Sequence, residues 1–275
     1  MSVAEAPPEQ TEEKPDERLA GSHRTARVLR RPEVGALAGA IAVFAFFALT
    51  TDSFVKASGA STWILTSSTF GIMAVAVSLL MIGGEFDLSA GAMWGTTGLT
   101  TGILMTEWNV NVWLAILASL VLALTIGMLN GVLVVRTGLP SFIVTLGTFF
   151  VLQGVNLAVT KIIINQVSVT GLNNVAGYTS GQQLFGSFVK INIGTTLTLY
   201  AVTFWWIAVT AIATWVLLRT KVGNWIFAVG GAVTSAHQVG VPVAATKIGL
   251  FMTTAFAGWL VGMLSLFKTT TVQST

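Results

Sequence analysis

Two carboxylates, Glu85 and Asp87, lie between two long apolar runs in the segment GGEFDLSAG at residues 83–91. Ionisable side chains near a membrane are costly and usually functional. The glycines are expected to break a helix, and Asp87 is placed to cap a following helix that begins near Ser89. Two interpretations remain open: Asp87 is a structural cap, or this polar break is a hinge or lines a path between helices. A catalytic carboxylate pair would also need an acid–base partner and a water-accessible pocket.

Three uncharged amides, Asn130, Gln153 and Asn156, lie inside later apolar runs. In a membrane such side chains either hydrogen-bond neighbouring helices or line a polar route. Together with Glu85 and the Asp87–Ser89 segment they are the candidates for a translocation path or hinge. Amides beside aromatic side chains suit a neutral, hydroxyl-rich solute better than an ion.

The composition excludes several classes of protein. Of 275 residues, 53% are hydrophobic and 9% charged, whereas a soluble domain carries roughly a quarter charged residues. With a mean hydropathy of +0.79, a water-soluble globular fold is excluded. The absence of cysteine excludes disulfides and thiolate metal sites, and two histidines cannot form a His-rich metal site. We therefore expect no catalytic residues and no metal site. The basic residues are scattered singly, so no nucleic-acid surface is predicted.

The order of segments predicts an all-α, polytopic transmembrane helix bundle. Residues 1–33 are polar and charged, which predicts a disordered tail, and its arginines before the first apolar run place the N-terminus in the cytoplasm. Seven apolar blocks follow, each about the 20 residues that cross a bilayer. They are residues 34–51, 62–82, 89–106, 111–135, 140–160, 194–218 and 247–267.

Glycines four residues apart predict close helix packing, because small residues let helix backbones approach in lipid. Five such pairs occur: Gly35/Gly39, Gly91/Gly95, Gly98/Gly102, Gly127/Gly131 and Gly258/Gly262. Two loops are long, 161–193 outside and 219–246 inside, and the second contains a helix-compatible stretch at Thr234–Gln238.

Four segments in order resemble the permease subunits of bacterial ABC sugar importers. This is the ribose, xylose and arabinose type, grouped with branched-chain amino-acid permeases. The segments are GGEFDLSAG, LNGVLVVRTGLPSFIVTLGT (129–148), RTKVGNWIFAVGG (219–231) and VGVPV (239–243). In the family the AVGG loop continues with Asn and an acidic, Ala-rich turn, whereas this chain has Ala232-Val-Thr-Ser-Ala-His237.

The resemblance implies roles for whole segments. Residues 34–275 would be a permease domain, one half of a pore formed with a second copy of the chain in the bacterial cytoplasmic (inner) membrane. Loop 219–246 would couple to an ATP-binding cassette subunit that binds the ATP, so this chain would need no cofactor and would not be an enzyme. The coupling residues would be Gly230, Gly231, Thr234, Ser235, Ala236, His237, Gln238 and Gly240. A periplasmic or lipid-anchored binding protein would deliver a monosaccharide or polyol to the external loops. The family has about ten helices, so the resemblance implies that the last few are missing.

Other functions stay open at this point. One is an ABC permease for branched-chain amino acids or another small neutral solute. A second is an ion-coupled secondary transporter, which needs a membrane-embedded ionisable site; only Glu85 and Asp87 are candidates, since nothing acidic follows Glu107. A membrane-embedded enzyme would need histidines or paired carboxylates on facing helices.

Overall fold

The structure is a computed structural model that describes residues 32–193 and 195–273. Nearly all of the predicted tail therefore lies outside the described residues. The chain forms two units, Met1–Val55 and Lys56–Thr275. The described part of the first unit is helix α2 (Pro32–Thr50), at the position of the first predicted block, and a short turn that follows it.

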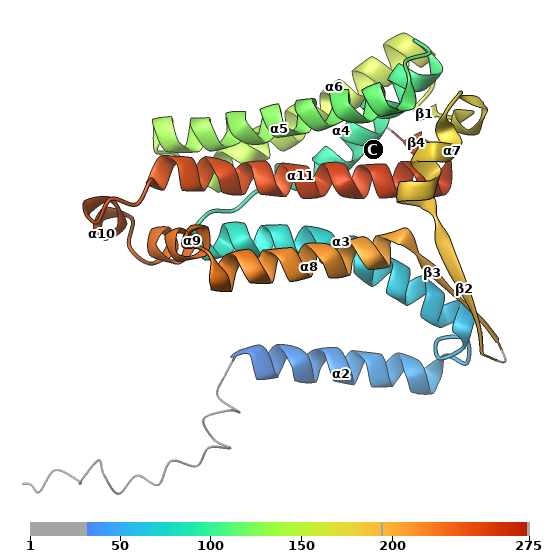
Figure 1. Cartoon of the computed structure of the whole chain (residues 1–275), viewed down its shortest axis with the longest axis horizontal. Helices are drawn as coiled ribbons and strands as arrows, with labels where there is room; N and C mark the ends of the chain where they lie inside the picture. The colour runs from blue at the N-terminus through green and yellow to red at the C-terminus, as the bar shows by residue number, and fades with distance from the viewer. Residues whose placement is uncertain (1–31, 194, 274–275) are drawn as a thin grey trace, which may run out of the picture. The chain divides into compact units, whose positions relative to one another are not determined.

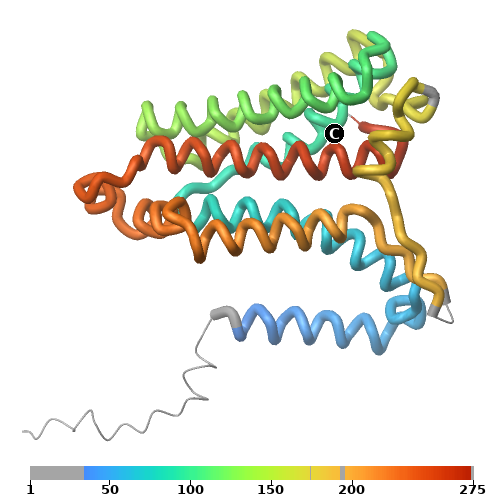
Figure 2. Tube along the Cα trace, viewed as in Figure 1, coloured from blue at the N-terminus to red at the C-terminus, as the bar shows by residue number. Residues whose placement is uncertain are grey.

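The second unit is a bundle of long helices, drawn in Figure 1 and traced in Figure 2. With α2 these helices occupy the seven predicted blocks, so the predicted all-α polytopic bundle is confirmed. Five of the described helices, α3, α5, α6, α8 and α11, are long and apolar enough to cross a membrane. Helix α4 is not among them, because its many glycines and threonines make it less apolar. Most of its side chains are nevertheless buried within the bundle. The bounds are α3 Ala57–Ile82, α4 Ser89–Thr106, α5 Val112–Thr137, α6 Ser141–Ile164, α8 Ala201–Arg219 and α11 Val243–Thr269.

Helix α11 is the central element, mostly buried and lying between α5 on one side and α3 on the other (Figure 1). Two of the glycine pairs explain how closely it packs. A Cβ added at Gly131 of α5 would lie 2.7 Å from Ile248 Cα of α11, closer than side chains approach. A Cβ added at Gly258 of α11 would lie 2.8 Å from Met93 Cβ of α4. Small residues thus bring three helix backbones together, as the spacing predicts.

One end of the bundle, which we call the hairpin end, carries an antiparallel hairpin of β2 (Phe188–Ile193) and β3 (Thr195–Tyr200). The prediction of a helix from residue 194 is wrong here, since α8 begins only at Ala201. The sequence TTLTLY alternates and is rich in β-branched residues, which favours a strand. The remaining short elements at this end are β1 (Ser168–Val169), β4 (Val272–Gln273), η2 (Leu172–Asn174), α7 (Tyr178–Gly181) and η3 (Gln182–Gly186).

Tyr178 links these short elements to α11 through two contacts with Phe267. Its hydroxyl donates to the Phe267 carbonyl oxygen at 3.1 Å, and the two rings lie 5.2 Å apart. Burial raises the pKa of the Tyr178 phenol above its ordinary value, so the hydroxyl stays a donor at physiological pH.

The opposite end, which we call the α9–α10 end, carries α9 (Lys221–Gly231) and α10 (Val233–Gln238). The short helix expected at Thr234–Gln238 is confirmed, while α9 is a helix that the sequence reasoning did not predict. Gly240, at φ +81°, ends α10: its N–H donates to the His237 carbonyl, and the Val241 N–H donates to the Ala236 carbonyl. This pair of bonds is a Schellman motif, which fixes the direction in which the chain enters α11.

Candidate functional site

The segment between α3 and α4 is a tight, hydrogen-bonded break near the α9–α10 end. Helix α3 ends in a second Schellman motif, in which the Gly84 N–H donates to the Met81 carbonyl and the Glu85 N–H donates to the Leu80 carbonyl. Gly84 has φ +83°, a conformation that glycine adopts without strain. The two glycines therefore end α3 sharply and turn the chain into the bundle.

The carboxylate of Asp87 lies inside the bundle and is 5% exposed. Its Oδ1 accepts from the Ser89 N–H at 2.8 Å and from the Ser89 hydroxyl at 2.6 Å. Its Oδ2 accepts from the Thr254 hydroxyl of α11 at 2.7 Å. The Ser89 N–H bond is the helix-capping contact expected of Asp87, at the first residue of α4. Thr254 adds a link between helices that a cap alone does not need.

The hydrogen bonds continue from Asp87 through α5 to α6. The Asn130 side-chain amide donates to Ser89 Oγ at 2.8 Å, and the Thr148 hydroxyl donates to Asn130 Oδ1 at 2.6 Å. The chain Thr254–Asp87–Ser89–Asn130–Thr148 thus joins α11, α4, α5 and α6, and we call it the four-helix network. Sequence reasoning selected Asp87, Ser89 and Asn130 as candidates, and the structure brings these three together.

Helix α6 also supports the break through its first turn. The Phe86 N–H donates to the Ser141 hydroxyl at 3.0 Å, and the Leu88 N–H donates to the Thr145 hydroxyl at 3.2 Å. An irregular backbone at membrane depth must find partners inside the protein, because lipid supplies none. Ser141 and Thr145 provide them.

Glu85 is separate from the network and forms an ion pair with Lys247 in the first turn of α11. The two side chains are 9% and 17% exposed, respectively. A nearly buried charge of this kind requires its partner. The pair therefore ties the break to the α9–α10 end of α11.

Gly230 of α9 lies directly against the break. A Cβ added there would overlap the Ile82 carbonyl oxygen, and it would lie 3.3 Å from the Gly83 carbonyl carbon. Gly231, the next residue, has nothing within 4 Å of an added Cβ among the described residues. Of this glycine pair, Gly230 is the residue that the close approach requires.

The other predicted residues are spread over two regions. The Asn156 amide donates to Thr96 Oγ1 of α4 at 3.1 Å, a helix-to-helix bond apart from the network. Gln153 is exposed on α6 and has no hydrogen bond to the residues that the structure describes. Of the coupling residues, Ala236 is buried, whereas the polar side chains of α10 are exposed: Thr234, Ser235, His237 and Gln238.

Several partners were missed from the sequence, among them Lys247, Thr254, Thr148 and Ser141. In the sequence Lys247 is only a charged residue near a helix end, and its partner Glu85 lies 162 residues away along the chain. Thr254 is one of many threonines in apolar runs, and Ser141 looked like part of a Pro-led turn. Among the described residues no three His, Cys, Asp or Glu side chains gather as a metal would require. The arrangement is thus one of positioning and charge pairing.

Replacing Asp87 with Asn tests the network. In Asn the side-chain oxygen must stay towards the Ser89 N–H, so the new N–H group faces the Thr254 hydroxyl, which can then donate only to the Phe251 carbonyl oxygen. Because the bonds that remain lose the charge of the carboxylate, we expect a loss of about 1–3 kcal/mol of stability. Thr254→Val removes one donor with little change of shape and should cost about 1 kcal/mol. The measurement is thermal unfolding of the purified variants in detergent. An Asp87→Asn variant as stable as the wild type would contradict the network.

A double-mutant cycle tests the ion pair. Lys247→Met leaves the Glu85 charge unpaired and should cost about 3 kcal/mol, whereas Glu85→Gln with Lys247→Met should recover most of that loss. The same unfolding measurement gives the coupling energy. Additive effects of the two single substitutions would show that the pair contributes nothing.

Comparison with known proteins places the chain among transport permeases. A family model described as "Branched-chain amino acid transport system / permease component" matches residues 59–275. The inner membrane ABC transporter permease protein YjfF of Escherichia coli K12 is 30% identical over 204 residues, 73% of this chain and 57% of that protein. The xylose/arabinose import permease XylH of Sulfolobus acidocaldarius is 28% identical over 258 residues, 90% of this chain and 66% of that protein.

The ribose import permease RbsC of Escherichia coli K12 is 28% identical over 210 residues, 76% of this chain and 61% of that protein. The chain thus spans 57–66% of the length of these three relatives. No solved structure matches it. The family match covers the whole bundle from α3 to α11, including the break, the network and the α9–α10 end. The chain is a multi-pass membrane protein that belongs to the family of the branched-chain amino acid transport system permease component.

Proposed function

We propose that this chain is the membrane permease subunit of an ATP-driven importer that carries a monosaccharide or a related small, hydroxyl-rich solute. Support for the substrate class comes from relatives named as permeases for ribose and for xylose and arabinose. A relative named for autoinducer 2 import, from Salmonella, matches at 25% identity. All of these solutes are small, and the proposal for this chain is restricted to that chemistry.

The observation that carries the mechanism is the contact between α9 and the break. Helix α10 presents four polar side chains to solvent at one end of the bundle, and α9 beside it meets the α3–α4 break at Gly230. A partner that pushes on α10 would move α9 as a rigid body against the break and, through Glu85 and Lys247, against α11. The break is joined to the four-helix network at Asp87, so one push reaches four helices.

We place the α9–α10 end in the cytoplasm, with the ATP-binding cassette subunit docked on α10 and binding the ATP. This chain would then perform no chemistry of its own. The hairpin end would face the solute-binding protein, and a second copy of the chain would complete the pore in the cytoplasmic membrane of a bacterium. The tail arginines before α2 would hold the N-terminus in the cytoplasm.

The contacts of the two membrane carboxylates, Asp87 and Glu85, disfavour an ion-coupled carrier. Such a carrier needs an acidic site that can release and rebind a cation. Asp87 accepts three hydrogen bonds from protein donors, and Glu85 is paired with Lys247. Both carboxylates are thus already engaged by protein groups that hold helices together.

The test is uptake into proteoliposomes that contain the full chain with its cognate ATPase and binding protein. We expect ATP-dependent uptake of D-ribose or D-xylose, and no uptake when ATP is replaced by a proton or sodium gradient. Replacing residues 234–238 with Gly and Ser should abolish uptake without changing membrane insertion, because α10 would lose its helix. Thr137→Ser in the exposed α5–α6 turn is the control and should transport normally.

Two results would contradict the proposal. Uptake driven by an ion gradient without ATP would assign the chain to secondary transport, and ATP-dependent uptake of L-leucine in place of sugars would assign it to amino acids. Wild-type uptake by the 234–238 variant would remove α10 from the coupling path.

A comparison of Gly230→Ala with Gly231→Ala tests the contact between α9 and the break. The first methyl group must displace the Ile82 carbonyl, so it should destabilise the protein by about 1–3 kcal/mol and lower uptake. The second meets open space and should leave both stability and uptake unchanged. The readouts are ATP-driven uptake and ATPase binding, and equal behaviour of the two variants would show that the contact transmits nothing.

A further inference from the structure

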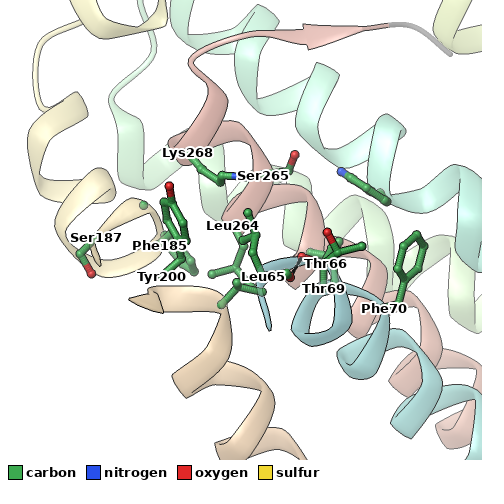
Figure 3. A pocket seen from close by; sticks show the side chains of 14 residues that line it. Leu65, Thr66, Thr69, Phe70, Phe185, Ser187, Tyr200, Leu264, Ser265 and Lys268 are labelled. Carbon is green, nitrogen blue, oxygen red and sulfur yellow. Dashed lines mark hydrogen bonds between the residues drawn. The ribbon is translucent and has the colours of Figure 1, made fainter. Parts of the chain in front are cut away.

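A small cavity opens at the hairpin end of the bundle, away from the Asp87 network (Figure 3). Its volume is 180 Å³, and it is bounded by α3, α4, α11, the η3 turn and the start of α8. This is several times the ~30 Å³ share of one water molecule in the liquid, but less than the ~300 Å³ at which drug-sized sites begin. The cavity therefore has room for one small solute.

The cavity is walled on one side by aromatic rings held in fixed positions. The Phe185 ring stacks between Trp205 and Phe267, with ring centroids 6.1 Å and 5.8 Å away, and it is 5% exposed. Tyr200 lies beside it in Figure 3. The stacked rings hold this wall rigid, and the wall gives the C–H groups of a solute an apolar surface.

Polar side chains that have no hydrogen-bond partner among the described residues also line the cavity. The hydroxyls of Thr66, Ser187 and Ser265 line it, and none of them is hydrogen-bonded to another residue in the part of the chain that the structure describes. Lys268 lies at the rim with its Nζ 5.1 Å from the centroid of the Tyr200 ring. A lysine ammonium offers three donors and no acceptor, so it complements hydroxyl or carbonyl oxygens of a ligand.

The charge of the lining decides between classes of ligand. Lys268 is its only charged residue and no acidic side chain lines it, which disfavours a cation. An acyl chain would offer the hydroxyls and the ammonium no hydrogen-bond partner. A neutral solute with several hydroxyls satisfies both the rings and the donors.

A second cavity lies beside this one, along α4. It has a volume of 410 Å³ and shares Trp94 and Ser265 with the first. It follows Gly91 and Gly95 of α4, and an added Cβ at Gly91 would have nothing within 4 Å. The second cavity therefore extends the space beside the first along α4.

We propose that the cavity at Lys268 is an outer subsite that binds one small, neutral, hydroxyl-rich solute, with Lys268 and Ser265 as hydrogen-bonding residues and with Phe185 and Tyr200 in its apolar wall. The proposal rests on the proposed function for its substrate class. Its location and its residues rest on the cavity alone.

The test is direct binding of radiolabelled D-ribose and D-xylose to the purified full chain, by equilibrium dialysis in detergent without ATPase or binding protein. We expect Lys268→Met and Ser265→Ala to weaken binding, Lys268→Met by about tenfold, the factor that one charge-assisted hydrogen bond supplies. Lys190→Met is the matched control, because Lys190 lies 5.4 Å from the Phe188 ring centroid on the same hairpin but does not line the cavity. Maltotriose, which is too large for the cavity, should not compete.

Binding that is lost in Lys268→Met and kept in Lys190→Met supports the subsite. No sugar binding by the wild type, or equal binding by both lysine variants, overturns it. Uptake assays test the proposed function separately. A wild-type chain that binds D-ribose here but imports no sugar with ATP contradicts the proposed function and leaves the subsite in place.

Discussion

A carboxylate buried in an apolar bundle must be satisfied by the protein, and the arrangement of helices around Asp87 follows from that requirement. Three donors reach its two oxygens, one from the backbone of Ser89, one from its hydroxyl and one from Thr254. None of these can come from lipid. Asn130 then orients Ser89 from α5. Any displacement of α11 or α5 relative to α4 breaks a bond to this group, so the network defines which helix positions are stable.

The glycines of the break allow it to lie directly beside α9. A Gly-Gly pair leaves the backbone of residues 82–84 uncovered by side chains, and Gly230 uses that space to bring a second backbone into contact. Close backbone contact is a stiff link, because neither side has a flexible side chain that could absorb a movement. The Glu85–Lys247 pair adds an electrostatic link from the break to α11. These two contacts support the proposal that motion at α9 is transmitted to the polar centre of the bundle.

Sequence reasoning reached the long helices and the capping contact of Asp87, because both are encoded locally. Twenty-residue apolar blocks mark the helices, and Gly83-Gly84 followed by Asp87 marks a stop and a new start. It missed the strand at Thr195–Tyr200, where an apolar average concealed an alternating pattern. It also missed α9, and it could not pair Lys247 with Glu85, since that contact spans 162 residues and no local pattern specifies it. The chain's long-range polar contacts are decided by packing.

The scarcity of charge has a different meaning at the two ends of the bundle. Near the break Glu85 is paired and Asp87 is hydrogen-bonded, so the polar groups there hold helices together. At the hairpin end, Ser265 and Lys268 line a cavity together with aromatic rings. An ammonium group among hydroxyls has no acidic neighbour with which to bind a cation. It can, however, donate hydrogen bonds to the oxygens of a neutral solute. This difference between the two ends supports the proposal that the chain passes a neutral solute while another subunit supplies the energy.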